Sequence, residues 1–401
     1  MEIINYDNNI EELKMEDIIQ HGEVNTERLG IDWILLNGCN YQCSYCFGQE
    51  KFKKDFIEID KLKHAVNEIF KIHKKYYSFT LVGGEVTYHP HFLELVEYIY
   101  SFNKNVSILL ITNGSKDTNY FNKIFSFVRD NIFSCIISVH FEYANLEHIK
   151  DLIKLFNEHK KNLHLNLMLH PEYKDKISSF LDDLLIMRKD YIFNLSLNEL
   201  REGPDFTRVD SRYDDDFFKW IDLSREKIYN SLFKPNIFQE TFNIYSKGYY
   251  LTNDYKKLTL NHDLAVRYNL KDFRKFYCCG GINLIRIESN GEYKAGICGV
   301  FPIVGNIYEE NIDICKIGNY RICTEEQCGC VVNDRNFKTR DINIAENYIF
   351  NYRRDNSYLV FSKENISIQD DKLNRLIDSI AWWIPVKKWR DNFRNNILCK
   401  K

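Results

Sequence analysis

Short β-rich runs alternate with amphipathic helical stretches through the first half of this chain. The runs are Ile31–Leu36, Ser78–Val82, Val106–Ile111, Phe133–Val139, Leu163–Leu169 and Tyr191–Leu197. Between the first two, apolar side chains such as Leu62, Val66 and Ile69 recur at helical spacing. This alternation predicts right-handed crossovers and a parallel sheet. Six units are too few to close an eight-stranded barrel.

Bulk properties restrict the class of protein. The chain has 401 residues, enough for more than one domain, and its net charge of −3 does not favour a nucleic-acid partner. The polar first twenty residues lack a secretory signal, and no apolar run is long enough for a transmembrane helix. Twelve cysteines without a signal peptide indicate metal chemistry in a reducing compartment, so we expect a cytoplasmic protein.

Three cysteines follow the first β-rich run at close spacing: Cys39, Cys43 and Cys46. Thiolates are soft ligands that suit iron–sulfur clusters and zinc. Three close-set cysteines with no nearby fourth ligand predict a cluster with one iron left open to a small molecule. A zinc site that uses a distant ligand, or three unrelated thiols, are the alternatives.

The spacing C-x3-C-x2-C, with Tyr45 before the last cysteine, resembles the radical S-adenosylmethionine (SAM) superfamily. The resemblance implies that Cys39, Cys43 and Cys46 hold a 4Fe–4S cluster whose fourth iron chelates the amino and carboxylate groups of SAM. It also implies an α/β fold with a partial (β/α)6 barrel. Active-site residues should then lie at the carboxyl ends of the strands, as in barrels generally.

Polar and glycine residues occur at several of these strand ends. Paired glycines allow close backbone approach to a ligand, and a carboxylate beside them can accept from an ammonium group. By resemblance to the family, we expect SAM contacts from Gly83, Gly84, Glu85, Thr112, Asn113, Ser138 and Asn166. His140, at the end of the fourth run, is a candidate for a substrate contact or a buried structural histidine.

A second cysteine group lies further along the chain, at Cys278, Cys279, Cys298, Cys315, Cys323, Cys328 and Cys330. Residues 282–297 predict a β-hairpin with an Asn290-Gly291 turn, which would bring Cys279 and Cys298 side by side. The remaining ligands would be Cys323, Cys328 and Cys330, and a zinc ribbon is the alternative.

This second region resembles the SPASM/twitch extension of radical SAM enzymes, which implies at least one auxiliary 4Fe–4S cluster. The spacing of the terminal cysteines departs from the usual pattern, so we expect one auxiliary cluster, with two as the alternative. Cys278 or Cys315 is then a spare ligand or a plain thiol. Cys135 and Cys399 are expected to be unligated.

The predicted organisation has four parts. Residues 1–30 form an irregular or short helical extension, and residues 31–235 form the partial barrel. Residues 236–276 are expected to be connecting helices and loop, within a small cysteine-rich α+β auxiliary-cluster domain at 236–345. Residues 346–401 form a helical tail.

The end of the tail interleaves Trp382, Trp383 and Trp389 with cations. Such a segment can seat at a membrane surface or pack on a partner or on the enzyme itself. It resembles a short segment of bacterial surface-polysaccharide biosynthesis proteins, which hints at a pathway.

The implied chemistry is reductive cleavage of SAM to methionine and a 5′-deoxyadenosyl radical, which abstracts hydrogen from a substrate. A one-electron reductant such as flavodoxin or ferredoxin is the implied partner. The first hypothesis for the substrate is a sugar or small metabolite of surface-polysaccharide biosynthesis. The alternative is modification of a peptide or protein side chain. From another class, the chain would be a zinc or iron–sulfur binding module without turnover.

Overall fold

The structure is a computed structural model that describes residues 13–24, 27–46, 55–128, 132–202, 208–231, 247–261, 270–326, 328 and 336–356. Its main sheet has nine strands, in the order β15-β14-β13-β2-β3-β4-β5-β6-β7. Six of them are parallel neighbours: β2 (Arg28–Leu36), β3 (Tyr76–Gly83), β4 (Asn105–Thr112), β5 (Ile132–Val139), β6 (Asn162–Leu169) and β7 (Asn194–Glu199). The predicted series of six parallel strands is therefore confirmed.

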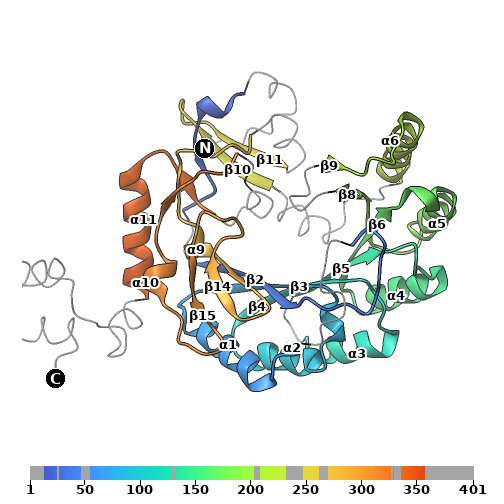
Figure 1. Ribbon diagram of the computed structural model, residues 1–401, viewed down its shortest axis with the longest axis horizontal. Coiled ribbons are helices and arrows are strands. Elements are labelled where there is room, and N and C mark those ends of the chain that lie inside the picture. Colours follow the sequence, from blue (N-terminus) through green and yellow to red (C-terminus); the bar gives the residue numbers. More distant parts are fainter. Residues whose placement is uncertain are drawn as a thin grey trace, which may run out of the picture.

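The helices that cross between these strands cover the outer face of the curved sheet (Figure 1). They are α1 (Ile59–Lys71), α2 (Phe92–Ser101), α3 (Thr118–Phe127), α4 (Leu146–Glu158) and α5 (Lys174–Met187), and α6 (Asp215–Asn230) follows β7. Alternate residues of each strand meet the helices in an apolar core. On β5, Phe133, Cys135 and Ile137 are buried in that core, whereas Ser138 is half-buried on the opposite face.

The predicted hairpin forms, and it extends the barrel sheet. β13 (Leu284–Ile287) pairs in parallel with β2 and antiparallel with β14 (Glu292–Ala295), which pairs with β15 (Ile303–Asn306). Gly291 has φ +88°, a conformation that glycine adopts without strain, so the Asn-Gly turn is confirmed. The Trp33 indole on β2 donates to Tyr308 Oη at 3.0 Å. The barrel and the cysteine-rich region thus share one continuous sheet.

A second sheet combines segments that are far apart in the sequence. Its order is β11 (Lys257–Asn261), β10 (Lys247–Thr252), β1 (Ile18–His21), β17 (Lys338–Thr339), β12 (Tyr277–Cys278) and β16 (Arg321–Ile322). The expectation of an irregular or short helical N-terminal segment is wrong for residues 18–21, which follow one 3-10 turn (Met15–Asp17). The expectation of connecting helices and loop is wrong for residues 247–261. The first error arises because β1 is specified by pairing with the distant strands β10 and β17. The second is a missed local hairpin, because β10 and β11 pair with each other.

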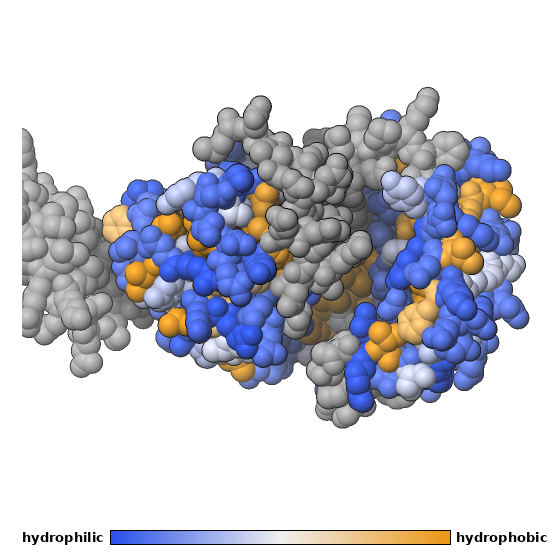
Figure 2. Space-filling view, turned by 90° about the horizontal axis from the view of Figure 1, so that it is seen from above, coloured by the Kyte–Doolittle hydropathy of each residue, from blue (hydrophilic) through white to orange (hydrophobic). Residues whose placement is uncertain are grey.

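In the described segments, no helix combines the length and the apolar character that crossing a membrane requires. Seen from above, the coloured surface is largely hydrophilic and its apolar side chains are scattered in small patches (Figure 2). The tail beyond residue 356, including Trp382, Trp383 and Trp389, lies outside the described residues.

A buried lysine joins the barrel to the C-terminal region. Lys74, just before β3, donates to the Ile282 carbonyl oxygen at 2.6 Å, and its Nζ lies 5.0 Å from the centre of the Tyr352 ring. Ile282 belongs to α9 (Gly280–Asn283) and Tyr352 to α11 (Ile342–Asp355). Burial lowers the pKa of Lys74 to about 7, and nearby Asp355 offsets part of this effect.

This buried lysine predicts a pH-dependent stability. Between pH 7 and 10.5 the unfolded chain holds a proton on Lys74 that the folded chain has released, so the free energy of unfolding rises with pH across this window. Lys74→Met removes up to about 1.4 kcal/mol per pH unit of this dependence. Urea unfolding of cluster-free protein at several pH values measures it. The matched control is exposed Lys219→Met, and identical slopes for Lys74→Met and wild type would contradict the prediction.

Candidate active site

The first three cysteines lie on the loop that leaves β2, at the carboxyl end of the strand. Cys43 is buried, Cys39 is half-buried and Cys46 is exposed. The Cys46 amide donates to the Cys43 carbonyl at 3.0 Å, and the Tyr41 amide donates to Cys39 Sγ at 3.3 Å. Burial, together with the nearby Glu142, Cys39 and Cys46, raises the pKa of Cys43 to about 12. Ionisation of Cys43 therefore needs a compensating positive charge nearby.

The donor set suits an iron–sulfur cluster. Among the described residues, no three His, Cys, Asp or Glu side chains converge on a single ion. A cubane is larger than one ion, so its three thiolate ligands need not point at one atom, and an all-thiolate set is what such clusters use. Cys39, Cys43 and Cys46 would hold such a cluster, which would supply an electron when reduced.

The predicted glycine pair packs directly against the cysteine loop. The Gly84 amide donates to the Leu36 carbonyl at 2.7 Å, and the Glu85 amide donates to the Gly38 carbonyl at 2.9 Å. A Cβ on Gly83 would lie 2.1 Å from the Leu36 oxygen, and one on Gly84 would lie 2.2 Å from the Gly38 oxygen. Both positions therefore require glycine, because the backbone of the cysteine loop passes so close. Both glycines stay solvent-exposed, which leaves the predicted approach of SAM open.

Glu85 ties the ends of β3 and β4 together. Its fully buried carboxylate accepts from Thr112 Oγ1 at 2.8 Å and from the Asn113 amide at 2.6 Å. It also accepts from the amide of Thr87 at 3.0 Å and from Thr87 Oγ1 at 2.6 Å. These four donors explain how a carboxylate is kept in the interior. The predicted bond to the SAM ammonium remains a prediction, and the ammonium would share Glu85 with these internal donors.

Asn113 reaches from the end of β4 to the cysteine loop. Its Nδ2 donates to Asn40 Oδ1 at 2.8 Å and lies 3.8 Å from Cys39 Sγ. The structure therefore brings Gly84, Glu85, Thr112 and Asn113 together beside Cys39.

Ser138 and Asn166 lie on a different part of the barrel, its inner wall. They are partners in the register between β5 and β6, and both are half-buried. Asn166 accepts a hydrogen bond from Ser196 on β7, and Ser196 is 2.8 Å from His164 Nε2. Ser196 and His164 thus form a row of neutral polar side chains with Asn166, but neither was predicted as a site residue. The alternation of polar residues with leucines in β6 and β7 could have indicated both.

Residues 140–143, in the loop after β5, contact the cysteine loop. Most of these contacts were not predicted from the sequence. His140 Nδ1 is 2.7 Å from Tyr45 Oη, and burial lowers the pKa of His140 to about 4. Tyr143 Oη accepts from the Gln42 amide at 3.0 Å, and the ring of Tyr143 stacks on Tyr41 at 4.2 Å. The sequence feature that could have indicated these contacts is the position of residues 140–143 directly after a predicted strand.

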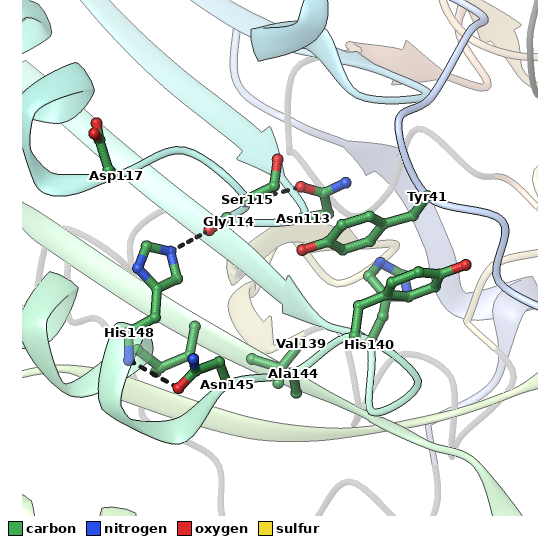
Figure 3. A pocket seen from close by; sticks show the side chains of 12 residues that line it. Tyr41, Asn113, Gly114, Ser115, Asp117, Val139, His140, Ala144, Asn145 and His148 are labelled. Atoms are coloured by element: carbon green, nitrogen blue, oxygen red, sulfur yellow. Dashed lines mark hydrogen bonds between the residues drawn. The ribbon is translucent and has the colours of Figure 1, made fainter.

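A pocket of about 280 Å³ opens between the loops that follow β4 and β5 (Figure 3). Tyr41, Asn113 and Tyr143 line it on the side of the cysteine loop. On the opposite side, His148 Nε2 donates to the Gly114 carbonyl at 2.8 Å and so ties α4 to the loop after β4. The stacked rings of Tyr41 and Tyr143 and the side-chain amide of Asn113 thus form the border between the pocket and the cysteine loop.

Cys279 and Cys323 of the second cysteine group both lie near Lys338 of β17. Cys323 and Cys328 lie in one buried cluster that includes Phe276, and the Cys279 amide donates to the Phe337 carbonyl at 2.9 Å. Burial raises the pKa of Cys279 to about 12 and also raises that of Cys323, and the buried Lys338 ammonium offsets part of both effects.

The other cysteines divide between the hairpin, the α10 region and the undescribed part of the chain. Cys298 is half-buried just beyond β14, at the open end of the hairpin where the Gly296 amide donates to the Leu284 carbonyl at 3.2 Å. Cys315 belongs instead to α10 (Ile314–Ile317), where Arg353 donates to its carbonyl. Cys330 and Cys399 lie outside the described residues.

Comparison with known proteins identifies the first region. Residues 33–184 match the family model of the radical SAM superfamily. A GTP 3′,8-cyclase of Nostoc sp. is 33% identical over 85 residues, which cover 20% of this chain and 26% of that protein. An S-adenosylmethionine-dependent nucleotide dehydratase of Psychrobacter lutiphocae is 27% identical over 114 residues, 25% of this chain and 38% of that protein. The alignments thus span well under half the length of these relatives.

Among solved structures, SuiB of Streptococcus suis bound to S-adenosylmethionine superimposes with a TM-score of 0.45 at 17% identity, over 73% of this chain and 66% of that chain. The family match spans the cysteine loop, the glycine pair and the strand ends from β3 to β6. Residues 33–184 therefore match a radical SAM domain, a family whose cofactors are a 4Fe–4S cluster and S-adenosylmethionine.

Proposed function

We propose that this enzyme abstracts hydrogen from a neutral, hydroxyl-rich small molecule, such as a sugar or a nucleotide-linked sugar. The observation that carries the proposal is the inner wall of β5, β6 and β7. Its positions are occupied by Ser134, Ile136, Ser138, Asn162, His164, Asn166, Met168, Asn194, Ser196 and Asn198. None of these described positions carries Asp, Glu, Lys or Arg. Neutral donors and acceptors of this kind match the hydroxyl groups of a sugar.

The proposed roles divide between the two regions of the chain. In the barrel, Cys39, Cys43 and Cys46 hold the cluster, and SAM contacts come from Gly83, Gly84, Glu85, Thr112, Asn113, Ser138 and Asn166. In the C-terminal region, at about residues 236–345, an auxiliary 4Fe–4S cluster is held by Cys279, Cys298, Cys323 and Cys328, with Cys330 as a further ligand. The surrounding barrel orients the reacting groups and excludes water. A flavodoxin- or ferredoxin-type protein delivers the electron.

The curated relatives add modest support for a nucleotide-linked substrate, because both are named for reactions of nucleotides. The tail sequence supports a surface-polysaccharide pathway. A peptide substrate is the competing outcome of the test below.

The substrate class is tested with anaerobically reconstituted protein, dithionite and SAM. The measurement is 5′-deoxyadenosine formation in the presence of uridine- or thymidine-diphosphate hexoses, free hexoses or short peptides. We expect stimulation by a hexose, and transfer of deuterium from the deuterated hexose into 5′-deoxyadenosine. Stimulation by peptides alone would overturn the sugar proposal while leaving the radical chemistry intact.

The second cysteine group is tested by metal content. Wild type is expected to hold about eight irons per chain, as two four-iron clusters require, and Cys279→Ala/Cys323→Ala about four. Elemental analysis after anaerobic reconstitution measures both iron and zinc. Cys315→Ala is the matched control and should keep all its iron. Zinc in place of four irons in the wild type would show that these cysteines form a zinc ribbon.

A further inference from the structure

A carboxylate from the loop after β5 holds the middle of the cysteine loop. The Ser44 amide, between the second and third cysteines, donates to both oxygens of Glu142, at 2.9 and 3.1 Å. The Ser44 hydroxyl donates to Glu142 Oε1 at 2.7 Å. Three hydrogen bonds from one residue to one carboxylate fix the backbone direction at Ser44. Hydrogen bonds to an ionised acceptor are about twice as strong as neutral ones.

A histidine beyond β6 sets the direction of the serine hydroxyl. His170 Nδ1 accepts from the Glu172 amide at 3.3 Å, so the neutral ring carries its proton on Nε2. Nε2 lies 3.2 Å from Ser44 Oγ and donates to it, which leaves the hydroxyl proton for Glu142. The His170 side chain is only 3% exposed and that of Glu142 16% exposed. His170 and Glu142 are thus largely shielded from solvent, whereas Ser44 is exposed.

This arrangement has two electrostatic consequences for a cluster on the loop. Backbone amides near cluster cysteines commonly donate to sulfur, and such bonds raise the reduction potential. Here the Ser44 amide is directed to Glu142 instead. The carboxylate also places a negative charge beside Ser44, which lies between the proposed ligands Cys43 and Cys46 in the sequence. Both the withdrawn donor and the added charge disfavour uptake of an electron.

We propose that Glu142 is a positioning residue that acts through Ser44 to fix the cysteine loop and to lower the reduction potential of its cluster. The proposal rests on the proposed cluster ligands Cys39, Cys43 and Cys46, and it is independent of the substrate. A low potential would matter because a reduced cluster held here would supply the one electron that SAM cleavage to methionine and the 5′-deoxyadenosyl radical requires. Glu142 would thus increase the driving force for electron transfer from the cluster to SAM.

The test is a potentiometric titration of the site cluster followed by electron paramagnetic resonance. It is made in the Cys279→Ala/Cys323→Ala background, so that one cluster contributes the signal. Glu142→Gln keeps the shape of the side chain and removes its charge, and we expect its midpoint potential to shift to more positive values at unchanged iron content. Glu142→Asp should restore most of the wild-type value. Glu147→Gln, 76% exposed on α4, is the matched control and should not shift. An unshifted midpoint in Glu142→Gln would overturn the proposal.

A second measurement does not require the cluster, and it tests the proposal even if the Glu142→Gln variant does not bind iron. In cluster-free protein, hydrogen exchange of the peptide that contains Ser44 should accelerate in Glu142→Gln, with no change in the thermal melt. Unchanged exchange would overturn the positioning role. The Cys43→Ala variant distinguishes failure of the ligand assignment from failure of the role of Glu142. If it keeps a SAM-responsive cluster, the ligand assignment fails; if it loses the cluster and Glu142→Gln shows no effect, only the role of Glu142 fails.

Discussion

Replacing Cys43 with alanine is expected to reduce 5′-deoxyadenosine formation to the level of a protein-free control. Three thiolates leave one iron open for SAM, and removal of one ligand leaves the cluster with two protein ligands. Cys43 is also the most buried of the three, at 5% exposure, so solvent cannot readily replace it. The measurement is chromatographic detection of 5′-deoxyadenosine from SAM and dithionite under anaerobic conditions.

Cys315→Ala is the matched control for this experiment. Cys315 is also a partly buried free cysteine, but it lies on α10 and is held through its carbonyl by Arg353. It should form 5′-deoxyadenosine at the wild-type rate. Substantial turnover by Cys43→Ala would show that the cluster uses another ligand set.

Gly84→Ala is expected to displace the cysteine loop and to prevent stable assembly of its cluster. The added Cβ would lie 2.2 Å from the Gly38 oxygen and 2.4 Å from the Asn37 oxygen. Both are backbone atoms, so no side-chain rotation relieves the clash. Overpacking of this kind costs about 1–3 kcal/mol when the backbone shifts to accommodate it. The checks are the urea midpoint of cluster-free protein and its iron content after reconstitution.

Gly299→Ala provides the comparison for Gly84→Ala. A Cβ there meets its nearest neighbour, Glu325 Oε1, at 3.8 Å, which is ordinary contact. This variant should keep both its unfolding midpoint and its iron. A Gly84→Ala protein with wild-type iron and stability would show that the cysteine loop can shift at no cost.

The barrel was predictable from the sequence because its strands are largely buried. Runs such as Phe133–Val139 and Leu163–Leu169 are rich in apolar residues and separated by helical patterns, a combination that indicates parallel crossovers. The hairpin was equally accessible, since Asn290-Gly291 between two β-rich runs is a strong local signal. In both cases the information is local.

Apart from the local β10–β11 hairpin, the second sheet could not be predicted, and neither could the contacts between residues 140–143 and the cysteine loop, because both depend on residues far apart in the sequence. β1 has four residues, and its partners β10 and β17 lie more than 200 residues away. Likewise, nothing in the sequence around Glu142 distinguishes it from other polar residues that follow a strand. Its role becomes visible only when the fold brings it to the Ser44 amide. The strand ends could be predicted as the site, but not which side chain reaches which loop.

The parallel pairing of β13 with β2 also affects how the chain is made. β2 has β3 on one edge and β13 on the other, but β13 follows it by about 250 residues. At typical synthesis rates, the growing chain holds an unpaired apolar edge of β2 for about 12–50 s before its partner leaves the ribosome. Such edges are templates for pairing with another chain. The nascent barrel therefore passes through a stage in which this edge of β2 is open to wrong pairing, until the β13 segment has been synthesised.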